Sequence, residues 1–137
     1  MSNHQPLSEN SNKFQKKYFD FSGRITGTTY FLRAFLANIL SFIAGYFCGY
    51  GWVISTPILV FGAVMLFLSL WYSLATVYKR ANAIDPKNVQ LWTGAVAIIS
   101  GILLFDDGGG FFRAMNVLGI VIHIYFIFQN AKSEVEA

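Results

Sequence analysis

Residues 52–78 read WVISTPILVFGAVMLFLSLWYSLATVY, an uncharged stretch that ends at Lys79 and Arg80. A helix needs about 20 apolar residues to cross the hydrocarbon core of a bilayer, and this stretch is long enough. Pro57 lies near its start, where the missing N–H of proline disturbs a helix least. The length of the run and its lack of period-two alternation argue against a buried strand. The stretch therefore predicts a transmembrane helix.

Three further apolar runs flank this one, at residues 30–48, 89–105 and 111–128. The connections are a tight Gly49-Tyr50-Gly51 link, a polar loop with an Asp-Pro turn signal, and an Asp-Asp-Gly-Gly-Gly loop. The run at 89–105 is the shortest of the four and is only just long enough to span the bilayer. The sequence thus predicts an all-α membrane protein, a four-transmembrane-helix bundle over residues 30–128.

The composition agrees with a membrane environment. The 137 residues are 55% hydrophobic and only 12% charged, and their mean hydropathy is +0.49. A soluble domain is roughly 45–50% apolar and about 25% charged. The composition therefore excludes a soluble globular enzyme and a disordered chain. The single cysteine, Cys48, excludes an internal disulfide.

The segments outside the bundle are more polar. Residues 1–12 are expected to form a disordered tail, and residues 129–137 a polar cytoplasmic tail. Residues 13–29, between the N-terminal tail and the first helix, are expected to form a short amphipathic segment. This segment would lie on the lipid headgroups with its lysines toward anionic lipid. Basic residues cluster at one set of helix ends, so the positive-inside rule places both termini in the cytoplasm. Because these charges border apolar runs, we expect membrane lipids as partners and no nucleic acid.

Each expected helix carries one stripe of small or polar side chains. The candidate polar interior consists of Asn38, Ser41, Ser69, Ser73, Asn116 and His123. Close helix packing with interhelical hydrogen bonds explains such stripes, and a polar path through the bundle is the functional alternative. Three roles are open to His123: a hydrogen-bonded core histidine, a proton relay, or a ligand of metal or haem. Since the apolar runs contain no second histidine and no carboxylate, we expect no metal and no cofactor.

The basic residues form a second candidate feature. The candidate basic cytoplasmic surface consists of Lys13, Lys16, Lys17, Arg24, Arg33, Lys79, Arg80 and Lys87. Arg33 lies inside the first helix, where it would extend to the headgroups or pair with an acid such as Asp20. The surface either fixes the orientation of the protein or docks anionic lipid or an acidic partner subunit.

Two motifs resemble a known family. Residues 19–26 read FDFSGRIT and residues 30–33 read YFLR. This is similar to the opening signature F-x-G-R-I-S-R-x-x-[FY]-W of the small bacterial inner-membrane proteins grouped as domain of unknown function 805. The family's second motif, R-R-L-H-D-x-G-x-x-G-W, corresponds to KRANA at 79–83 and Trp92, with Asn82 and Ala83 in place of His-Asp. The resemblance implies a diverged member of this family, a four-helix protein of the bacterial inner membrane.

Neither the resemblance nor the residues supply a catalytic constellation. The sequence contains no Ser-His-Asp order, no HExxH motif and no pair of intramembrane carboxylates. We therefore expect a non-enzymatic accessory subunit of a membrane complex, or a homo-oligomer. The alternative is a small channel or holin-like permeation element lined by the polar interior.

Overall fold

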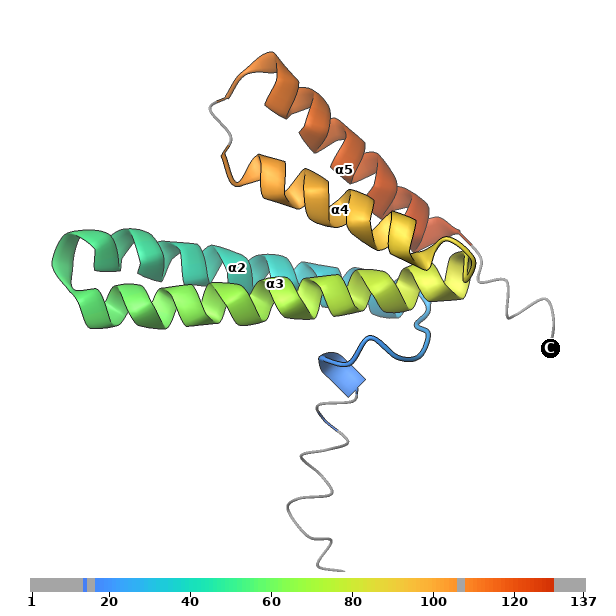
Figure 1. Ribbon diagram of the computed structural model, residues 1–137, viewed down its shortest axis with the longest axis horizontal. Coiled ribbons are helices and arrows are strands. Elements are labelled where there is room, and N and C mark those ends of the chain that lie inside the picture. The colour runs from blue at the N-terminus through green and yellow to red at the C-terminus, as the bar shows by residue number, and fades with distance from the viewer. Residues whose placement is uncertain (1–13, 15–16, 106–107, 130–137) are drawn as a thin grey trace, which may run out of the picture.

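The computed structural model describes residues 14, 17–105 and 108–129, and in this part of the chain it is helical without strands. The helices are α2 (Gly27–Ile54), α3 (Thr56–Ile84), α4 (Val89–Leu103) and α5 (Gly110–Phe128) (Figure 1). Helices α2, α3 and α5 are long and apolar enough to cross a membrane, whereas α4 is a shorter apolar helix of 15 residues. The all-helical class is thus confirmed for the described residues, and the three long helices support a membrane protein.

Helices α2 and α3 are longer than the sequence predicted. Their 28 and 29 residues correspond to about 42–44 Å, which exceeds a hydrocarbon core of about 30 Å. The predicted link at Gly49-Tyr50-Gly51 is helical instead. The backbone of α2 passes so close to α3 there that a Cβ on Gly51 would overlap the backbone of Leu59. The chain turns at Ser55, whose backbone is extended, just before Pro57 in the first turn of α3.

Helix α3 continues past the dibasic pair that was expected to end it. Ala81, Ala83 and Ile84 are buried, and the helix ends at Ile84 before Asp85-Pro86. The connection to α4 is closed by the Asn88 side-chain amide, which donates to Asp85 Oδ2 at 2.9 Å. Apolar packing of the last turn therefore carries the helix beyond Lys79 and Arg80.

The helices form two hairpins, α2–α3 and α4–α5, which meet at one end and diverge toward their turns (Figure 1). The hydrophobic core lies at the joined end, where all four helices contribute side chains. Its buried members are Tyr30, Val77, Ala81, Ile84, Val89, Val96, Ile99, Ile122 and Phe126. The joined end is therefore the packed part of the molecule.

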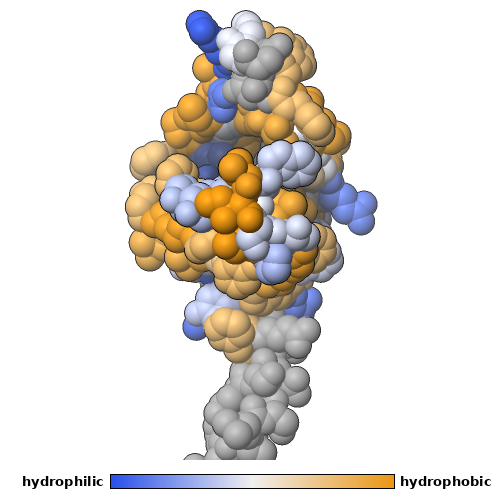
Figure 2. Space-filling model, turned by 90° about the vertical axis from the view of Figure 1, so that its left-hand side faces the viewer, coloured by the Kyte–Doolittle hydropathy of each residue, from blue (hydrophilic) through white to orange (hydrophobic). Residues whose placement is uncertain are grey.

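Apolar side chains cover much of the outside. Figure 2 shows hydrophobic residues over most of the described surface at the end where α2 turns into α3. Phe42, Trp52 and Val53 are about four-fifths exposed. Contiguous exposed apolar surface on this scale is typical of contact with lipid or with another protein.

Candidate functional site

Arg80 is the centre of the junction between the hairpins. Its side chain is buried, and its Nε donates to the carbonyl oxygen of Phe126 at 2.6 Å. Nη1 donates to the carbonyl oxygen of Ile25 at 3.0 Å, and Nη2 donates to that of Gln129. One guanidinium on α3 thus binds the segment before α2 and the last turn of α5. The carbonyls that end a helix have no partners within it, and a cation there also complements the helix dipole.

The same junction requires a glycine. Gly27 begins α2, and a Cβ added to it would overlap the carbonyl oxygen of Ile127 on α5. The start of α2 and the end of α5 therefore approach each other directly through their backbones.

The segment before α2 is held along α3 by side chains that bind its carbonyl groups. Trp71 Nε1 donates to Phe19 O at 3.1 Å, Asn82 Nδ2 to Gly23 O at 3.1 Å, and Lys79 Nζ to Lys17 O at 2.7 Å. Phe21 also packs edge-on against the Trp71 and Tyr78 rings. These contacts position residues 19–25, which contain no helix or strand, together with the short helical stretch at residues 17 and 18. The predicted amphipathic segment lies partly outside the described residues and stays a prediction.

The candidate basic surface divides into buried and exposed members. Lys79 and Arg80 are only 3% and 2% exposed, so the exposed surface expected from the sequence does not include them. Their side-chain nitrogens donate to the backbone carbonyl oxygens of residues 17, 25, 126 and 129. Arg33 is half-buried, and its Nη1 donates to Lys17 O at 3.2 Å. Lys17, Arg24 and Lys87 are exposed, while Lys13 and Lys16 lie outside the described residues.

The acid that was considered as a partner of Arg33 has another contact. Asp20 Oδ2 accepts a hydrogen bond from Ser22 Oγ at 2.6 Å. This hydrogen bond is the main reason that the pKa of the Asp20 carboxyl is lowered, and the charge of Lys79 acts in the same direction. Asp20 therefore stays ionised beside the buried lysine.

A polar cleft lies between the two hairpins. Its volume is about 320 Å³, and it lies among α2, α4 and α5. The polar side chains that line it are Asn38, Ser100, Asn116 and His123. Three of these belong to the candidate polar interior, so the structure brings Asn38, Asn116 and His123 together. Ser100 was missed, although it follows Ala97 at helical spacing in the small-residue stripe of α4.

His123 joins the cleft to the buried core. Its Nδ1 forms a hydrogen bond with the hydroxyl of Tyr30, which is completely buried. The two rings stack with their centroids 5.9 Å apart, and Phe126 packs edge-on against Tyr30. The sequence analysis singled out His123 but not its pairing with Tyr30, which no local spacing reveals. Because Nδ1 is engaged by Tyr30, Nε2 is the ring nitrogen left for an occupant of the cleft.

The remaining polar candidates lie elsewhere. Ser41 Oγ and Ser69 Oγ form a hydrogen bond of 2.6 Å, and Ser69 Oγ also donates to Ala37 O at 3.1 Å. These serines join α2 to α3, as expected of close helix packing. Ser73 is half-buried on α3 and is not among the residues lining the cleft. Within the described residues, no group of three or more His, Cys, Asp and Glu side chains lies close enough together to hold a metal ion.

No family model, curated protein or solved structure matches this chain. The resemblance to domain of unknown function 805 therefore rests on the two motifs alone and stays a prediction.

Proposed function

We propose that the chain is an integral membrane protein with four crossings and both termini on one side. The hydrogen bonds of Arg80 support this topology, because they bring together the approach to α2 and the end of α5. Because α2 starts where α5 ends, the chain crosses the membrane an even number of times. Helix α4 is therefore one of the four crossings, although it is short. Its 15 residues span about 22 Å, so local thinning of the bilayer accompanies α4.

By the positive-inside rule, both termini lie on the cytoplasmic side of the membrane. Exposed Lys17, Arg24 and Lys87 belong to the joined end of the molecule, and Arg113 is exposed near the start of α5. The family resemblance favours the bacterial inner membrane as the location.

Within that membrane, we propose a non-enzymatic role in assembly, as an accessory subunit or as a homo-oligomer. The observation that carries this proposal is the polar cleft between two otherwise apolar hairpins. Asn38, Asn116 and His123 would be costly next to lipid tails, so protein or water covers them in the membrane. A helix from a second copy or from a partner subunit fits this requirement, because interhelical hydrogen bonds join membrane helices.

The test is the mass of the purified full chain in mild detergent, measured by light scattering and native mass spectrometry. We expect a fixed oligomer or a fixed complex for the natural chain. Asn116→Leu removes a polar group from the cleft and should weaken that assembly. Its matched control is Asn88→Leu in the α3–α4 connection. A monomer without partners, or an assembly unchanged by Asn116→Leu, would contradict the proposal.

A permeation element is the second candidate function, and the polar lining of the cleft favours it. A pore would need the polar side chains of several copies to face one axis. Ser41 and Ser69 do not contribute to such a lining, because they bind each other between α2 and α3. Ion flux through liposomes that contain only this chain, abolished by His123→Leu, would favour permeation over assembly.

A further inference from the structure

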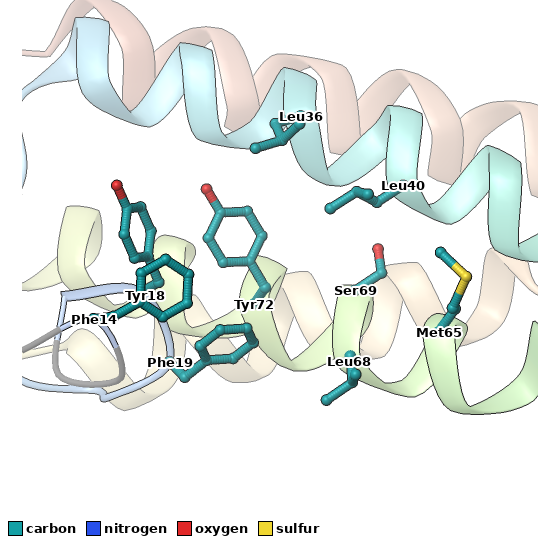
Figure 3. A pocket seen from close by; sticks show the side chains of 9 residues that line it. All are labelled: Phe14, Tyr18, Phe19, Leu36, Leu40, Met65, Leu68, Ser69 and Tyr72. Carbon is teal, nitrogen blue, oxygen red and sulfur yellow. The ribbon is translucent and has the colours of Figure 1, made fainter. Parts of the chain in front are cut away.

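An apolar pocket lies between the N-terminal segment and one face of the α2–α3 hairpin (Figure 3). Its volume is about 470 Å³, which is within the range of small-molecule sites. The walls are formed mainly by Tyr18, Phe19, Leu36, Leu40, Met65 and Tyr72. This pocket is separate from the polar cleft, with which it shares no lining residue.

The hydroxyl group of Tyr72 is the first indication of a ligand. Tyr72 is 5% exposed, and its oxygen is the one buried side-chain polar atom of the described residues without a hydrogen-bond partner. Thr76, one turn later, donates its hydroxyl to the Tyr72 carbonyl oxygen instead. Figure 3 shows the Tyr72 hydroxyl directed toward α2, at the side of the pocket that Leu36 borders. A buried hydroxyl without a partner is unfavourable, and an acceptor on a bound molecule would satisfy it.

Two cations lie against the ring of Tyr18, which lines the pocket. Lys17 Nζ lies 5.3 Å from the centroid of the Tyr18 ring, and Arg33 Cζ lies 5.0 Å from it. The Tyr18 ring in turn packs against the ring of Tyr72, with the two centroids 6.3 Å apart. Asp20 is the acid in this region, and its carboxylate accepts from Ser22.

The opposite end of the pocket is apolar. From Tyr72 to Met65 the pocket follows α3 for two turns, about 10 Å, with Leu40 across it on α2. Along the pocket, the cations come first, the Tyr72 hydroxyl second and the apolar end third. A phospholipid carries its phosphate, its glycerol ester and its acyl chain in the same order.

We propose that this pocket binds an anionic phospholipid. One acyl chain lies between Leu40 and Met65, an ester carbonyl accepts the Tyr72 hydroxyl, and the phosphate lies beside Arg33 and Lys17. Basic residues near a membrane surface attract anionic headgroups, which gives the site its preference for charge. The inference rests on the proposed membrane location and not on the proposed assembly.

The test uses native mass spectrometry of the purified full chain, with phosphatidylglycerol and phosphatidylcholine of identical acyl chains in equal amounts. We expect phosphatidylglycerol to be retained preferentially. Arg33→Gln should lower that preference about fivefold, the usual effect of one basic residue. Arg113→Gln, at the far end of the molecule, is the matched control and should leave the preference unchanged. Equal retention of the two lipids by the natural chain would overturn the proposal.

Two further variants separate a site from a general attraction to charge. Tyr72→Phe should lower phosphatidylglycerol retention without lowering the melting temperature of the lipid-free protein, and Tyr50→Phe is its control. Leu40→Trp should fill the apolar end and reduce the retention of both lipids. If both Tyr72→Phe and Leu40→Trp retain as much lipid as the natural chain, the proposal is overturned. The oligomeric mass in the same spectra reports on the assembly separately, so the two proposals fail independently.

Discussion

Arg80 on α3 donates its Nε–H to the carbonyl oxygen of Phe126 on α5, at 2.6 Å within the buried junction. The remaining nitrogens of the guanidinium bind Ile25 and Gln129. Arginine suits this position because its planar group carries five donors in fixed directions. A single side chain thereby links the segment before α2 to the end of α5.

Arg80→Gln should destabilise the protein by several kcal/mol, because each buried carbonyl left without a partner costs roughly 1–3 kcal/mol. Thermal unfolding of the full chain in detergent measures the change. Arg113→Gln is the control, since Arg113 is exposed and should tolerate the substitution. Equal melting temperatures for the two variants would show that Arg80 does not hold the junction.

Gly27→Ala should also destabilise the junction, because the added Cβ meets the Ile127 carbonyl oxygen. Gly45→Ala is the matched control on the same helix, where nothing lies within 4 Å of an added Cβ. The control should be stabilised by about 0.5–1 kcal/mol, the usual gain on removing a glycine from a helix. Denaturant unfolding of both variants should therefore give changes of opposite sign, and the same sign would contradict the close approach.

The Tyr30–His123 hydrogen bond should appear as a coupling energy between the two side chains. Tyr30→Phe, His123→Leu and the double variant form the cycle, and we expect a coupling of about 0.6–2 kcal/mol. Unfolding in detergent provides the three free-energy changes. Strict additivity would mean that the two groups do not bind each other.

The N-terminal segment should become more accessible when its anchors are removed. Asn82→Ala loses the bond to Gly23 O, so trypsin should cleave faster after the exposed Arg24. Asn88→Ala, which loses a bond confined to the α3–α4 connection, is the control. Cleavage rates that match in the two variants would show that residues 17–25 are held by other contacts.

Much of the fold follows from the sequence because apolar runs mark membrane helices directly. The uncharged run at 52–78 lies within α3 except for its first four residues, and α5 begins one residue before its predicted start. The spacing of Asn116 and His123, two helical turns apart, places both on one face of a helix, and both line the cleft. Periodicity along one helix is enough for such predictions.

Contacts between distant segments could not be predicted in this way. Lys79 and Arg80 end an apolar run, which is typical of exposed charges at a membrane surface. Their burial depends on carbonyl groups at residues 17, 25, 126 and 129, which only the tertiary structure brings near. A local signal existed in the small and apolar residues Ala81, Ala83 and Ile84, which allow α3 to continue past the pair.

In the proposed topology α4 crosses the membrane, so that both ends of the chain lie in the cytoplasm. Fusions of alkaline phosphatase, which is active only outside the cytoplasm, test this directly. We expect activity for a fusion after Gly109 and none for fusions after Lys87 or Ala137. An active fusion at Ala137 together with an inactive fusion at Gly109 would mean that α4 does not cross, and would contradict the four-crossing topology.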